Sequence, residues 1–107
     1  MNKELWKEVL DIDPPITLED KQREIIRHYG EENQLNKLIE ECSELIQAIC
    51  KYKDNTSIFN LDNMVEEMAD VTNIIEQVKL TDDFYKHELD KWKTEKVDRQ
   101  LLRIREE

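Results

Sequence analysis

The sequence predicts an all-α domain, an antiparallel helical bundle of about four main helices. The chain has 107 residues but only one glycine and two prolines. Glycine-rich phosphate loops, Rossmann crossovers and folds rich in β-hairpins all need glycine at positive φ, so this composition argues against them. The chain uses Glu, Lys, Leu, Ile and Gln instead, which are mostly good helix formers. Apolar residues also recur at helical spacing.

Length and apolar content predict a single domain with a thin core. A chain of 107 residues falls in the usual range for one domain. Leu, Ile, Val and Phe make up 29 residues, or about 27%, which exceeds the roughly 20% below which charged chains stay disordered. Because the core is thin, we expect copies of the chain to associate.

We expect residues 1–16 to form an N-terminal extension and residues 17–105 to form the bundle. The extension starts with a short amphipathic piece, which Pro14-Pro15 ends because neither ring can continue a helix. The apolar residues of that piece are Leu5, Trp6, Val9 and Leu10.

A capping motif predicts the first helix of the bundle, and a stripe of apolar residues predicts the second. Residues 17–20 resemble a capping box that opens the first helix, and Gly30 fits its C-cap. Apolar spacing predicts a second helix at about 32–53. Its stripe consists of Leu35, Leu38, Ile39, Cys42, Leu45, Ile46, Ile49 and Cys50.

The other two helices follow a turn-rich segment. Residues 54–60 are predicted to be a loop, and a third helix is expected at about 62–79. Residues 81–83 are predicted to cap a fourth helix that ends near residue 105. Short loops between long amphipathic helices favour antiparallel packing.

The net charge and the cysteine content limit the classes of binding partner and the cellular compartment that we expect. A net charge of −10 argues against nucleic acid and suits a chain that holds a divalent cation. No apolar run approaches the ~20 residues of a membrane span and no signal peptide opens the chain, so we expect a cytoplasmic protein without a membrane partner. Cys42 and Cys50 lie eight residues apart on one predicted helix and cannot pair with each other there. We expect both to be buried, in a reducing compartment.

Two pairs of acidic residues occupy unexpected positions on the predicted helices. Glu67 lies inside the apolar stripe of the third helix, and Asp70 follows three residues later. Burial of an unpaired carboxylate is costly, so we expect the Glu67 carboxylate to have a binding partner at this position. On the second helix, Glu41 borders the stripe and Glu44 is its neighbour at i+3.

If the two helices are antiparallel, these four carboxylates can converge. Oxygen donors of this kind suit Mg²⁺, which prefers octahedral oxygen coordination. A di-iron site would need two Glu-x-x-His motifs, but Ile25 and Phe84 stand three residues before the two histidines, His28 and His87. We find no credible serine or cysteine nucleophile.

Two segments carry a resemblance to a known family. HYGEENQLNKLIEECSELIQAI and NMVEEMADVTNIIEQVKL resemble the MazG-like nucleoside triphosphate pyrophosphohydrolases, in their short single-domain phage and bacterial form. The family pattern is Glu-x-x-Glu, a spacer, then Glu-x-x-Asp. Here Glu41-Cys-Ser-Glu44 is followed by 22 residues, 45–66, and then by Glu67-Met-Ala-Asp70. The resemblance covers residues 26–80 well and the fourth helix loosely.

The resemblance implies Mg²⁺-dependent hydrolysis of a nucleoside triphosphate to the monophosphate and pyrophosphate, with Mn²⁺ as a substitute ion. It also implies a homodimer or a dimer-of-dimers tetramer, with sites near subunit interfaces. Glu41, Glu44, Glu67 and Asp70 would hold the metal. Either Glu41 or Glu44 would take the proton of the attacking water.

Several polar residues are candidates for substrate binding, each with a simpler alternative. Lys96, Arg99 and Arg103 lie on one face of the fourth helix and would clamp the β- and γ-phosphates, or form a solvated basic face. Asn73 would extend the metal shell or touch the sugar. Lys37 would reach phosphate or pair with Glu41. Gln34 would touch a base or be solvated.

Two other classes of protein stay open at this point. One is an acidic helical interaction module of phage type without catalysis, whose acidic residues would spread over the outer surface. The other is a degenerate family member that only oligomerises, although the presence of all four carboxylates argues against it.

Overall fold

The computed structural model describes residues 17–107, so the predicted amphipathic piece before Pro14-Pro15 lies outside the described residues. This part of the chain is all-helical and contains no strand, as predicted. The four helices are α2 (Leu18–Tyr29), α3 (Glu31–Asp54), α4 (Ile58–Lys79) and α5 (Asp83–Glu106). None of them is long and apolar enough to cross a bilayer.

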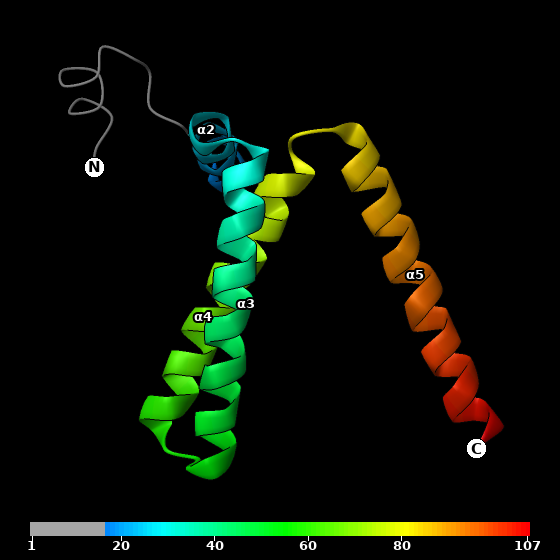
Figure 1. The fold of residues 1–107 in the computed structure, drawn as a ribbon. Coiled ribbons are helices and arrows are strands. Elements are labelled where there is room, and N and C mark those ends of the chain that lie inside the picture. Colours follow the sequence, from blue (N-terminus) through cyan, green and yellow to red (C-terminus); the bar gives the residue numbers. More distant parts are fainter. Residues whose placement is uncertain (1–16) are drawn as a thin grey trace.

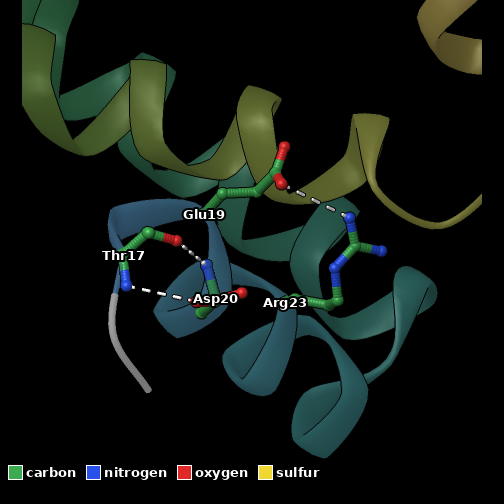
Figure 2. Close-up of polar contacts among 4 residues, drawn as sticks. All are labelled: Thr17, Glu19, Asp20 and Arg23. Atoms are coloured by element: carbon green, nitrogen blue, oxygen red, sulfur yellow. Dashed lines mark hydrogen bonds and ion pairs between the residues drawn. The ribbon is translucent and has the colours of Figure 1, made fainter.

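The predicted caps of α2 are confirmed at both ends. Thr17 Oγ1 accepts the Asp20 backbone N–H at 3.0 Å, and Asp20 Oδ2 accepts the Thr17 backbone N–H at 3.2 Å, which makes a reciprocal capping box (Figure 2). Gly30 has a φ of 84°, a backbone conformation that residues with a Cβ atom rarely adopt. Its backbone N–H donates to the carbonyl of Ile26. The chain can therefore turn sharply from α2 into α3.

The loop predicted at 54–60 is wrong in its length, because α4 begins at Ile58. Ser57 is the cause: its side-chain oxygen accepts the backbone N–H of Asn60 at 3.1 Å and so caps the helix early. The amide of Asn60 also donates to the carbonyl of Asn55 at 2.9 Å and ties the short turn together. The predicted cap of α5 is confirmed, with Asp82 as the capping residue.

The α3–α4 hairpin is the centre of the fold. The two helices run antiparallel and side by side, and α2 lies across the end where α3 begins (Figure 1). Helix α5 contacts this hairpin through its first turns only and then diverges from it (Figure 1). The Tyr85 hydroxyl donates to Glu31 at 2.6 Å, and Lys79 lies 3.7 Å from Asp90.

The buried apolar core is small. Among the described residues, its buried apolar members are Ile26, Ala48, Ile74 and Val78. Much of the apolar stripe of α3 faces outward, including Ile39 and Ile46, which are 71% and 63% exposed. Our expectation that Cys42 and Cys50 are buried is wrong for the single chain, where both are exposed. The reason is that α4 covers only one side of the α3 stripe.

Candidate metal centre

Three of the four carboxylates that we expected to converge from the two hairpin helices lie together. Glu41 comes from α3, and Glu67 and Asp70 come from α4 at i and i+3. Each offers one carboxylate oxygen, and these three oxygens lie within 4.8 Å of one another. We call this cluster the acidic triad. Glu41 is only 6% exposed, while Asp70 is more accessible.

Two oxygens of the triad lack a hydrogen-bond donor. Glu41 Oε2 and Glu67 Oε2 are buried and make no hydrogen bond with any described residue. A buried carboxylate oxygen without a partner is costly, and the cost grows when other carboxylates are close. A hard divalent cation would relieve both penalties, because carboxylate oxygens are its preferred ligands. The donor set could therefore hold a divalent metal ion.

Electrostatics at the triad agree with this geometry. Burial raises the pKa of Glu67 first, and the negative charges of Asp70 and Glu41 raise it further. Both causes disfavour the charged form of the Glu67 carboxyl.

Glu44, predicted as a fourth metal ligand, lies beside the triad but is not part of it. It is exposed on α3, and its pKa is raised first by the negative charge of Glu41, then by a hydrogen bond with Glu41 and by partial desolvation, with a smaller contribution from the charge of Glu67. The fourth carboxylate is therefore near the site and accessible to water.

These pKa shifts predict how stability depends on pH without metal. The carboxyl of Glu67 titrates near 4.5 in the unfolded chain and higher in the folded chain, so folded protein binds this proton more tightly. The stability of the wild type relative to Glu67→Gln should then fall as pH rises from about 4.5 through the raised pKa, and stay level above it. Urea unfolding in EDTA between pH 4 and pH 8 measures this difference.

The matched control for that titration is Glu106→Gln, since Glu106 is exposed at the end of α5. Its stability difference from the wild type should show no comparable fall. A Glu67→Gln difference that is constant across the range would mean that Glu67 has no unfavourable charge environment.

Lys37 pairs with the triad from one side. Its Nζ lies 3.2 Å from Glu41 Oε1 and 3.5 Å from Glu40 Oε2. The hydrogen bond to Glu41 is the main cause that raises the pKa of Lys37. Of the two roles left open for Lys37, the structure thus contains the pairing with Glu41, which leaves Glu41 Oε2 without a donor.

An open cleft begins at the triad and runs toward α2. Its volume is about 670 Å³, within the range of small-molecule sites. Glu41 and Asp70 lie at one end, and Tyr29 and Gln34 line the cleft further along. Asn73, a predicted substrate-binding residue, lines it too. Gln34 is 7% exposed rather than solvated, and its amide donates to Gln77 at 2.6 Å.

The predicted phosphate clamp is not brought to the triad within one chain. Lys96, Arg99 and Arg103 lie in the C-terminal half of α5. That half of the helix diverges from the hairpin (Figure 1). Lys96 and Arg99 instead lie over the ring of Trp92, 6.0 Å and 5.9 Å from its centroid. Within the single chain, these three cations are therefore not placed to clamp the β- and γ-phosphates of a nucleotide at the triad.

The burial of Gln34 and Gln77 beside the cleft was not predicted from the sequence. Gln22, Gln34 and Gln77 are each no more than 7% exposed. Gln22 lies four residues before the buried Ile26 on α2, and Gln77 lies between Ile74 and Val78 on α4, so their positions among apolar residues were the available signal. No family model matches the chain, and the searches of curated proteins and of solved structures find no match either.

Proposed function

We propose that the chain hydrolyses a nucleoside triphosphate to the monophosphate and pyrophosphate with a divalent cation, Mg²⁺ or Mn²⁺. One observation carries this proposal: three carboxylates converge on the hairpin with two buried oxygens that have no donor, at the end of a cleft of ligand size. The resemblance to MazG-like pyrophosphohydrolases, which stays a prediction, names the reaction.

Glu41, Glu67 and Asp70 would hold the cation. Bound there, it supplies charge neutralisation at the phosphoryl oxygens and acidifies a coordinated water. The rest of the cleft is less acidic than the triad and offers amides and one lysine, which suit the uncharged parts and the phosphates of a nucleotide.

Glu44 and Lys37 would have separate roles beside the cation. Glu44 is accessible and has a raised pKa, so of the two candidate bases it is the one free to accept the proton of the attacking water. Lys37 pairs with Glu41 and lines the cleft, where its ammonium would contact a phosphate of the substrate.

We also propose that the protein is a homo-oligomer of at least two chains. Large apolar side chains are exposed on both α3 and α5, among them Ile39 and Ile46 on α3 and Leu102 and Ile104 on α5. The radius of gyration of the chain is 18.1 Å, against about 13 Å for a compact domain of about 100 residues. A second copy between the hairpin and the outer part of α5 would cover the exposed stripes of both.

Light scattering at micromolar concentration should give at least a dimer, and a monomer mass would contradict this.

The reaction itself is tested by a product assay. Purified protein with Mg²⁺ should release pyrophosphate from at least one of the common nucleoside triphosphates, and excess EDTA should abolish the release. Orthophosphate as the primary product would contradict attack at the α-phosphorus. Absence of any turnover across all common nucleotides would favour the acidic interaction module instead.

A further inference from the structure

A three-residue hydrogen-bond relay connects helix α2 to the cleft. The side-chain nitrogen of Gln22 donates to Glu76 Oε2 at 2.6 Å and to Asn73 Oδ1 at 3.2 Å. Gln22 is 5% exposed, so solvent cannot easily replace either partner. Asn73 is the member of the relay that lines the cleft of the acidic triad.

Chemistry fixes the orientation of each amide in this relay. A reversed Gln22 would set its carbonyl oxygen against the carboxylate of Glu76, so the charge of Glu76 holds the Gln22 nitrogen in place. A reversed Asn73 would set nitrogen against nitrogen, so Gln22 in turn holds Asn73 Oδ1. The nitrogen of Asn73 makes no hydrogen bond with another described residue and is left for the cleft.

We propose that Gln22 is a positioning residue that locks Asn73 as a hydrogen-bond donor to a phosphoryl oxygen of the ligand in the cleft. This rests on the proposed function for the identity of the ligand. A phosphoryl oxygen can only accept, so a donor of fixed polarity is useful to it. A sugar hydroxyl can donate or accept and would not need a locked amide. The nitrogen of Asn73 is also not a metal ligand, which separates its role from that of Asp70 one turn earlier.

Substitutions that change polarity but not shape test the relay. Gln22→Met removes both hydrogen bonds at similar volume and should raise the dissociation constant of the ligand about three- to tenfold. The double variant Gln22→Glu with Glu76→Gln reverses the relay: Gln at 76 can donate to Glu at 22, which can then accept from Asn73. It restores the internal hydrogen bonds and the net charge, but turns the oxygen of Asn73 toward the cleft.

The probes are the α,β-methylene analogues of the common nucleoside triphosphates with Mg²⁺, measured by calorimetry, together with thermal melting of each variant. The double variant should melt close to the wild type yet bind the analogue as weakly as Gln22→Met or more weakly. Gln47→Met, on the exposed side of α3, is the control and should match the wild type in both measurements.

Binding that recovers together with stability in the double variant would overturn the phosphoryl assignment. Unchanged binding in Gln22→Met, or no binding of any analogue to the wild type, would overturn it as well. A wild type that binds an analogue but cleaves no nucleotide would refute the proposed reaction and leave the positioning role of Gln22 intact.

Discussion

Glu67→Gln should reduce turnover of the nucleoside triphosphate by about a hundredfold or more. The substitution keeps the size of the side chain and replaces one of the three converging carboxylates with a neutral amide. A catalytic cation contributes several kcal/mol at the transition state, and each 1.36 kcal/mol corresponds to about a tenfold change in rate. Steady-state kinetics at saturating Mg²⁺ measure the loss.

The same variant should keep its fold, which separates a catalytic defect from a structural one. Without metal the charge of Glu67 is disfavoured by burial and by Asp70 and Glu41, so its removal should leave the melting temperature in EDTA unchanged or higher. Glu66→Gln is the matched control, because Glu66 is the adjacent exposed acid on α4 and lies outside the triad. Equal turnover of Glu67→Gln and the wild type would exclude Glu67 from the site.

The helices and the triad were predictable because their signals are local. A capping box at Thr17, a glycine at the end of α2 and regular apolar spacing each act within a few residues. The position of Glu67 within a stripe likewise depends only on the geometry of its own helix. Antiparallel pairing of α3 and α4 then follows from the short turn between them, which is enough to bring Glu41 to Glu67 and Asp70.

Features that depend on which helices meet were not predictable in this way. The periodicity of α3 shows that Cys42 is in the stripe, but not that α4 covers only one side of that stripe. The sequence of α5 alone shows that Lys96 and Arg99 share one face of that helix. The distance of this face from the triad depends instead on the direction in which α5 leaves the hairpin. The relay through Gln22 joins residues more than 50 positions apart and has no local signature.

A divalent cation should stabilise the protein far more than monovalent salt does. A ligand that binds only the folded state adds about 2.7 kcal/mol at a hundredfold excess over its dissociation constant. For a domain of this size that corresponds to a rise in melting temperature on the order of 10 °C. NaCl only screens charges, and it acts on all surface carboxylates alike.

Variants assign this stabilisation to the triad. Alanine at Glu41, Glu67 or Asp70 should remove most of the shift that is specific to the divalent cation. Alanine at Glu44, which lies beside the triad, should erode it less. Alanine at the exposed Glu32 should leave it unchanged.

The most direct test of the metal centre is therefore a comparison of melting temperatures in MgCl₂ and in NaCl at equal ionic strength. An organised site at Glu41, Glu67 and Asp70 predicts a rise of about 10 °C with Mg²⁺ over NaCl, lost when a triad residue is replaced. Equal melting temperatures in the two salts would contradict the metal centre, and with it the proposed reaction.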